Sequence, residues 1–244
     1  MSTATGDLVR ELAKTALPRP VLRLGRRVQR YLYGYGWRMP AKLAPLPPGA
    51  SPELQLAHRA WQVAAGSEAD QRCYYSLEFE SFHLPGERPW HLRWALLRQA
   101  AAWPGSRVLE LGCNLGLLAT FAVRAGAEDA LGVDVGAPLL QANRLLQQAH
   151  RVSYGVLQLD FDDRRPWEDA LSAFRPTLVT ALSVLEWVKD KERFLDFLGR
   201  FDTVLFEGHD SDAVERERLG RVGFTDITLL GRSEHNRPVL LARR

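Results

Sequence analysis

Three carboxylates stand at or near the ends of three apolar stretches, at a spacing that could build one ligand site. Glu110 lies in "VLELG", Asp134 ends "LGVD" and Asp160 ends "LQLD". If these stretches are neighbouring parallel strands, their carboxyl ends meet at one sheet edge, where ligands bind. Taken alone, Asp160 is better explained as a helix cap or a solvated turn residue. Three such acids in succession favour a ligand with ribose hydroxyls, an amino group or a positive charge.

A glycine turn, "LGCNLG", follows the first acid. Gly112 lets the backbone turn and approach a ligand without a Cβ in the way, and Gly116 lets the next helix pack close to the strand. The N–H groups at that helix start suit a carboxylate or a phosphate. The dinucleotide fingerprint G-x-G-x-x-G is not met, because Asn114 and Leu117 occupy its second and third glycine positions. The turn therefore argues against a dinucleotide.

Apolar and helical patterns alternate from Arg107 onward, which is typical of parallel strands joined by crossover helices. The last two strand candidates, "GFTDITLLG" and "RPVLLAR", are separated only by "RSEHN", which indicates an antiparallel hairpin. The predicted fold is a doubly wound α/β fold with a mostly parallel seven-stranded Rossmann-like sheet, a reversed strand in the C-terminal hairpin and an N-terminal helical extension. The remaining strands are expected at 107–111, 130–134, 155–160, 178–182 and 203–207, with helices at 116–125, 137–149 and 190–199.

This arrangement resembles class I S-adenosylmethionine-dependent methyltransferases over roughly residues 104–244. "VLELGCNLG" matches the glycine-rich first motif of that family and "LGVD" its acidic second motif. "LQLD" and "ALSVLEWV" match the third and fourth motifs less strictly, and the terminal hairpin matches the reversed seventh strand. The resemblance implies that the cofactor is S-adenosylmethionine and the product S-adenosylhomocysteine.

The resemblance also implies roles for the residues of the first two motifs. Gly112 and Gly116 would shape the loop under the methionine part of the cofactor, and Glu110 would support that loop and the amino group. Asn114 would belong to the same loop, although many members have a glycine at this position. Asp134 would hold the ribose hydroxyls.

The third and fourth motifs would serve the rest of the cofactor. By the same resemblance, Asp160 would accept a hydrogen bond from the adenine amino group and Phe161 would offer the ring an apolar wall. Ser183 or Val184, after the fourth strand, would also line the cofactor. Trp187 would either line the acceptor pocket or fill the core, and the core is the better supported of the two.

Transfer of the methyl group needs little help once the acceptor is placed, because a sulfonium is a good electrophile. A hydroxyl acceptor would benefit from a general base, for which His209 and Glu186 are the candidates, with Glu207 and Asp210 nearby in sequence. A histidine has the ordinary pKa closest to neutral pH. Each candidate also has a plainer explanation, since Glu186 can cap a helix and His209 can lie in an exposed loop.

The acceptor would be bound by parts outside the common fold. "YYSLEFESFHLPGERPWHLRW" is loosely similar to segments that precede the core in bacterial methyltransferases acting on glycans and other small hydroxylated molecules. We therefore expect O-methylation of a small molecule or glycan. The alternatives are an RNA methyltransferase, a non-catalytic cofactor-binding protein, and, for this segment, an ordinary helical cap. The residues expected on the acceptor side are Tyr74, Tyr75, His83, Arg88, Trp90 and Trp94.

The charge of the chain is uneven. Residues 1–50 hold nine Lys or Arg against Asp7 and Glu11, a net charge of +7, whereas the whole chain carries +3. A basic segment of this kind suits an anionic membrane surface or RNA, unless its apolar stripe packs on its own domain. The expected divisions are a basic amphipathic segment with linker (1–50), a helical acceptor-side cap (51–103) and the methyltransferase core (104–244).

The remaining bulk properties favour a cytoplasmic protein, with or without peripheral membrane attachment. The N-terminus lacks a basic start followed by an apolar stretch, so no signal peptide is expected. No apolar run approaches the roughly 18 residues that span a bilayer. The two cysteines, Cys73 and Cys113, have no metal-site spacing and predict no disulfide framework, so no metal is expected.

Overall fold

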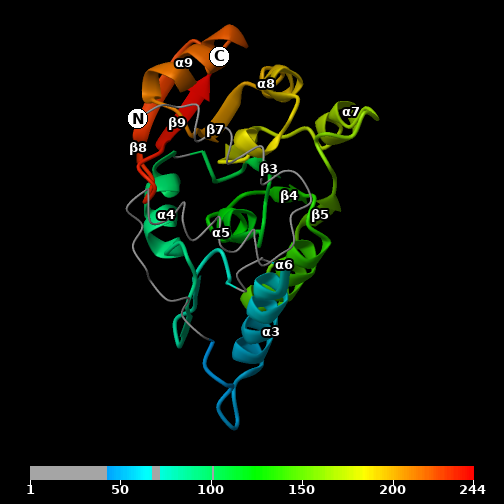
Figure 1. Cartoon of the computed structure of the whole chain (residues 1–244), viewed down its shortest axis with the longest axis vertical. Coiled ribbons are helices and arrows are strands. Elements are labelled where there is room, and N and C mark those ends of the chain that lie inside the picture. The colour runs from blue at the N-terminus through cyan, green and yellow to red at the C-terminus, as the bar shows by residue number, and fades with distance from the viewer. Residues whose placement is uncertain (1–42, 68–71, 101) are drawn as a thin grey trace, which may run out of the picture.

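The computed structural model describes residues 43–67, 72–100 and 102–244, and its centre is a seven-stranded sheet (Figure 1). The strand order is β5-β4-β3-β6-β7-β9-β8. β9 is antiparallel to both of its neighbours, and the other adjacent pairs are parallel. The predicted fold class, including the reversed strand, is confirmed. The strands are β3 (Arg107–Leu111), β4 (Asp129–Asp134), β5 (Gly155–Gln158), β6 (Leu178–Leu182), β7 (Thr203–Glu207), β8 (Asp226–Arg232) and β9 (Pro238–Arg243).

The order of the strands creates a switch point between β3 and β6. From β3 the chain continues to β4 on one side, and it later returns to the other side of β3 with β6. Leu111, the last residue of β3, is paired with Val133 on β4 and with Ala181 on β6. The carboxyl ends of these three strands therefore lie together, which is where open α/β sheets bind ligands.

Two apolar cores lie on the two faces of the sheet. Successive strand residues point to opposite faces, so Val108 belongs to one core and Leu109 to the other. The first core contains α5 (Leu117–Arg124) and α6 (Ala137–His150). The second contains α7 (Glu168–Ser172), α8 (Lys191–Leu198) and α9 (Asp212–Arg221).

The part of the chain before the sheet shares the first core. α3 (Pro52–Ser67) lies beside α6, and Ser51 Oγ caps it by accepting from the Leu54 N–H at 3.2 Å (Figure 1). β1 (Leu77–Glu78) pairs with β2 (His83–Leu84) in a separate antiparallel sheet of two short strands. The last elements before the sheet are α4 (Trp90–Leu97) and the 3-10 turn η1 (Arg98–Ala100).

Most of the predicted N-terminal segment lies outside the described residues, including its basic amphipathic helix and the membrane or RNA contact assigned to it. The described end of this segment packs on α3, where the Ala44 carbonyl lies 2.9 Å from His58 Nε2. Among residues 43–67, 72–100 and 102–244, no helix has the length and apolar character that crossing a bilayer requires.

Candidate functional site

The turn between β3 and α5 has a left-handed backbone at three positions. Gly112 has φ +72°, Asn114 has φ +49° and Gly116 has φ +66°. The Gly112 N–H donates to the Val133 carbonyl at 2.8 Å, which ties the turn to the end of β4. Asn114 Oδ1 accepts from the Leu115 N–H at 2.9 Å, and an asparagine tolerates this conformation better than most residues do. Asn114 therefore takes the place of a glycine at little conformational cost.

Both glycines of the turn are also sites of close packing. A Cβ on Gly116 would overlap the Asn143 amide of α6 and the Tyr154 hydroxyl, and the Gly116 carbonyl accepts from that hydroxyl at 2.8 Å. A Cβ on Gly112 would lie 2.9 Å from Val184 Cγ2, just after β6. Gly116 thus allows close packing of the turn against α6 and Tyr154.

Two of the predicted acids hold this turn in place. Asp134 Oδ2 accepts from the Asn114 N–H at 2.8 Å, and its Oδ1 accepts from the Gly136 N–H at 2.9 Å. Glu110 Oε2 accepts from the Ala119 N–H in the first turn of α5 at 3.0 Å. Since Gly116 at the N-cap has no side chain, Glu110 performs the capping from the strand.

The environment of Glu110 favours its neutral form. Burial raises the pKa of Glu110 to about 8, with a smaller contribution in the same direction from Asp134, while the Ala119 N–H and Arg93 act to lower it. The carboxyl group therefore binds a proton readily at neutral pH in the free protein. A cation beside it would favour the ionised form.

The first prediction concerns pH. Between the ordinary pKa of 4.5 and the folded value of about 8, the unfolded chain has released the Glu110 proton while the folded chain retains it. The contribution of Glu110 to the free energy of unfolding therefore falls as pH rises through this range, by up to about 1.4 kcal/mol per unit. Glu110→Gln is expected to remove that slope, as measured by urea unfolding at several pH values. The exposed Glu128→Gln is the control, and an unchanged slope in Glu110→Gln would contradict the assignment.

The second prediction concerns Asp134. Asp134→Ala is expected to weaken binding of the cofactor that the motifs imply by about 1–3 kcal/mol. The turn would lose two charge-assisted hydrogen bonds, and in the predicted role of Asp134 the ribose would lose its partner as well. Calorimetric titration with S-adenosylhomocysteine measures this loss. Asp129→Ala, at the far end of the same strand, is the matched control. Equal affinities of the two variants would exclude Asp134 from the site.

On the adenine side, the two predicted residues have different surroundings. Asp160 is exposed, and its Oδ1 accepts from the Asp162 N–H at 2.9 Å. This is the geometry of a solvated turn residue, which was the alternative explanation of Asp160. The Phe161 ring is 8% exposed and lies 5.2 Å from the rings of both Trp167 and Phe194. Phe161 thus packs in the second core beside this edge, and its contact with adenine stays a prediction.

Ser183, just after β6, has an uncommon backbone. Its φ is +61°, and its side chain is buried. Ser183 Oγ accepts from Arg237 Nη1 at 3.1 Å, which fixes the β8–β9 turn over the ends of β6 and β7. Non-glycine residues with positive φ often mark functional sites, so this position beside the switch point agrees with a role near the cofactor.

The structure places the candidate bases in ion pairs or hydrogen-bonded turns. Glu186, in the 3-10 turn η2 (Leu185–Trp187), pairs with Lys191 Nζ at 3.0 Å. The backbone N–H of His209 donates to Glu215 Oε1 at 3.0 Å, in the loop after β7. Their catalytic roles stay predictions. The prediction that Trp187 fills the core is wrong, because this residue is 76% exposed.

A buried ion cluster near the same sheet edge was not predicted from the sequence. Arg93 and Arg88 both pair with Glu207 at the end of β7, Arg88 Nη2 at 3.2 Å from Oε1. Burial alone would raise the pKa of Glu207, but Arg93 and Arg88 together outweigh it and lower the pKa to about 2. In the part of the chain that the structure describes, Nε and Nη1 of the buried Arg93 have no hydrogen-bond partner. A signal existed, because Arg93 shares the helical spacing of the apolar Trp90 and Leu97.

The aromatic residues expected around the acceptor mostly lie inside the protein. Tyr75 and Trp90 are buried, and Trp94 packs against Trp103 and Phe121. Trp90 and Trp94 join α4 to Phe121 of α5, and Tyr75 packs on Trp90. Their aromatic character therefore reflects packing more than recognition of an acceptor.

Comparisons with known proteins agree with this geometry. Residues 87–235 match the family described as "Methyltransferase domain". The chain belongs to this family. Its fold and motifs are those of the class I S-adenosylmethionine-dependent methyltransferases, as the sequence predicted.

Among solved structures, the methyltransferase is similar to the N-terminal domain of EvdMO1 with S-adenosylhomocysteine bound. The TM-score is 0.58 at 16% identity, covering 78% of this chain and 95% of that one. A longer structure of EvdMO1 has a TM-score of 0.54 at 18% identity, covering 69% and 43%. A curated relative, the ubiquinone biosynthesis O-methyltransferase of Hahella chejuensis (strain KCTC 2396), is 31% identical over 138 residues, 55% of this chain. The chain spans about half (48%) of that relative's length.

The residues of the site fit the charges of S-adenosylmethionine. The N–H groups of Arg93 that lack partners suit a carboxylate, and Glu110 suits a cationic group. The oxygens of Asp134 retain lone pairs for ribose hydroxyls, because each accepts one backbone hydrogen bond.

Proposed function

We propose that this methyltransferase transfers a methyl group to a hydroxyl oxygen of a small molecule or glycan. The observation that carries the proposal is the 31% identity with an O-methyltransferase over 138 residues. "ALSVLEWV", which begins with the last two residues of β6, lacks the N-P-P-Y-type sequence that marks many enzymes acting on base amino groups, which supports the same acceptor class.

In this proposal the cofactor binds across the ends of β3, β4 and β5. Arg93 holds the carboxylate of its methionine part, and Glu110 lies beside the ammonium group. The glycine turn passes under the methionine part, Asp134 binds the ribose, and Asp160 accepts from the adenine amino group. Arg93 is the main addition to the residues inferred from sequence, and its burial beside two acids supports the assignment.

When bound, the cofactor supplies an electrophilic methyl group. The chain's own residues would orient the acceptor oxygen in line with it and exclude water. Residues 51–103 and the β8–β9 turn would form the acceptor side, and the exposed Trp187 would offer an apolar face there. The hydroxyl proton leaves to water or to a base, for which Glu186 and His209 remain candidates.

The test is a turnover assay with radiolabelled S-adenosylmethionine and a panel of phenols, sugars and RNA. We expect transfer to hydroxylated small molecules or glycans, with a product that survives mild alkali and hydroxylamine, as ethers do and esters do not. Labelling of RNA alone would overturn the proposed acceptor class. If the protein binds the cofactor tightly but transfers no methyl group to the panel or to fractions of a cell extract, a non-catalytic cofactor-binding protein is favoured.

Residues 1–50 are proposed to attach the enzyme to an anionic surface, and their charge of +7 supports this. Sedimentation with anionic liposomes is expected for the full chain. It is expected to be lost when Arg23, Arg26, Arg27 and Arg30 are all replaced by Gln, with S-adenosylhomocysteine affinity unchanged. If the full chain does not sediment with liposomes but binds RNA with a steep salt dependence, the partner of this segment is RNA and not a membrane.

A further inference from the structure

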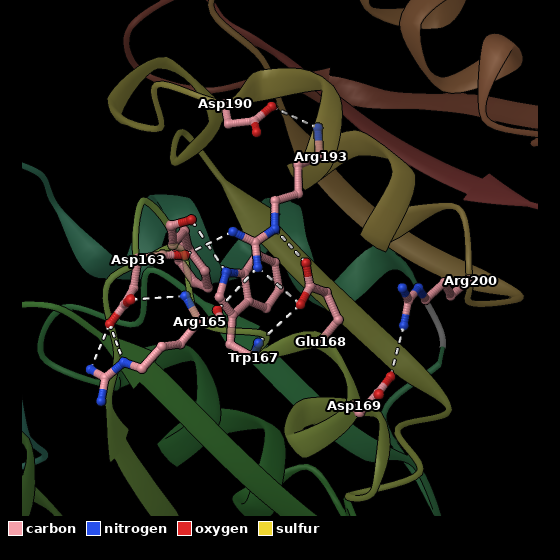
Figure 2. A network of polar contacts seen from close by, with 9 residues as sticks. Asp163, Arg165, Trp167, Glu168, Asp169, Asp190, Arg193 and Arg200 are labelled. Carbon is pink, nitrogen blue, oxygen red and sulfur yellow. Dashed lines mark hydrogen bonds and ion pairs between the residues drawn. The ribbon is translucent and has the colours of Figure 1, made fainter.

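The segment that follows β5 is tied to the beginning of α8. It carries Asp160 and Phe161, and it leads into α7. Figure 2 shows the polar network that joins it to α8, with Arg193 at the centre. β5 is the edge strand of the sheet, whereas α8 follows β6 on the other side of β3. The network therefore joins two parts of the chain that the sheet itself keeps apart.

Arg193 uses most of its donors on this one segment. Nε and Nη2 donate to the two carboxylate oxygens of Glu168 at 2.5 and 3.1 Å. Nη1 donates to the Asp163 carbonyl at 2.8 Å, and Nη2 donates to the Arg165 carbonyl at 3.1 Å. The guanidinium also lies 5.2 Å from the centre of the Trp167 ring. A planar fork of five N–H donors makes such a set of contacts, which the single ammonium of a lysine does not.

The Glu168 pair stays charged under assay conditions. The hydrogen bond from Arg193 is the main reason that the pKa of Glu168 is lowered to about 2. Protonation therefore does not release the segment at neutral or mildly acidic pH.

Further contacts continue from this network to Asp160. The Lys189 N–H, just before α8, donates to Asp162 Oδ1 at 2.7 Å, and the Asp162 N–H donates to Asp160 Oδ1 at 2.9 Å. On the apolar side, the Phe161 ring packs against Phe194 of α8. Asp160 is thus linked to the turn before α8 through Asp162, and its neighbour Phe161 packs on α8 itself, although Asp160 is exposed.

We propose that Arg193 is a positioning residue for adenine recognition, acting by holding the Asp160 segment against α8. This rests on the proposed function, in which Asp160 accepts from the adenine amino group. Arg193 does not touch the cofactor. Its effect is selective, because the turn at Gly112–Gly116 and the ribose acid Asp134 are held by other contacts.

The test compares two ligands by calorimetry: S-adenosylhomocysteine and S-inosylhomocysteine, in which a carbonyl replaces the adenine amino group. The wild type is expected to prefer the adenine ligand. Arg193→Ala and Arg193→Lys are expected to lower that preference by roughly tenfold, the equivalent of one hydrogen bond. Arg200→Ala is the control, because Arg200 pairs with Asp169 of α7 at 3.3 Å through exposed side chains.

The outcomes separate the two proposals. Equal loss of affinity for both ligands in Arg193→Ala, with the preference kept, would mean a merely structural role and would overturn the inference. Unchanged affinity and preference would overturn it as well. A wild type that binds neither ligand, or binds both equally, would instead count against the adenine site of the proposed function.

Discussion

Arg93→Met is expected to reduce cofactor affinity by at least about a hundredfold, because in the proposed function the carboxylate of the cofactor's methionine part loses its buried charge-assisted partner. The same change is expected to lower the free energy of unfolding by about 3–5 kcal/mol, since it removes one of the two arginines that compensate the fully buried Glu207. Calorimetry with S-adenosylhomocysteine and urea unfolding measure the two effects. Arg98→Met, exposed on η1, is the control for both.

A second variant separates binding from stability. In Arg93→Met/Glu207→Gln the buried carboxylate is neutral, so much of the stability is expected to return while the cofactor affinity stays low. If the double variant recovers both, Arg93 only compensates Glu207 and does not bind the cofactor. If the single variant binds normally, the assignment of Arg93 is wrong.

Gly116→Ala is expected to reduce methyl transfer by about a hundredfold or more, because a displacement near 1 Å at the reacting groups is enough for such a loss. The alanine would have to adopt a left-handed backbone, and its Cβ would overlap Asn143 and Tyr154, both buried. Together these effects are expected to cost about 2–5 kcal/mol of stability. Transfer rates at saturating cofactor and thermal unfolding are the measurements.

Gly105→Ala is the matched control for this change. Gly105 has a similar φ of +72°, but an added Cβ there would meet no atom within 4 Å. It therefore tests the backbone penalty without the steric overlap, and we expect about 1–2 kcal/mol of destabilisation with transfer unchanged. If both variants lose activity to the same extent, crowding against α6 is not what makes Gly116 necessary.

The sheet and the positions of the three acids follow from the sequence because they depend on local patterns. Apolar runs that end before a glycine or at an acid define the ends of β3 and β4, whereas β5 ends at Gln158, two residues before the predicted end at Asp160. The short "RSEHN" connection leaves room only for a hairpin. α9 was not predicted, because it lacks such a local pattern. Its buried face holds only Glu215 and Leu219, which is too little for a periodic apolar signal.

What the sequence did not predict depends on contacts between distant segments. The exposure of Trp187 is set by how η2 leaves the sheet, and a tryptophan in an apolar stretch gives no sign of it. Arg93 and Glu207 are 114 positions apart in the chain, so the local sequence around either residue does not predict their ion pair. Phe161 follows an acid at a strand end, and only the placement of α8 decides that it packs inward.

The burial of both cysteines makes this enzyme convenient for distance measurements in solution. Cys73 is 1% exposed and Cys113 is 2% exposed, and they are the only cysteines in the sequence. Burial also raises the pKa of the Cys113 thiol, so its reactive thiolate form is scarce. A maleimide dye or spin label would therefore attach selectively to thiols introduced on the surface, for example at Trp187 and Arg200. The distance between two such labels can then be followed during turnover without first replacing a native cysteine.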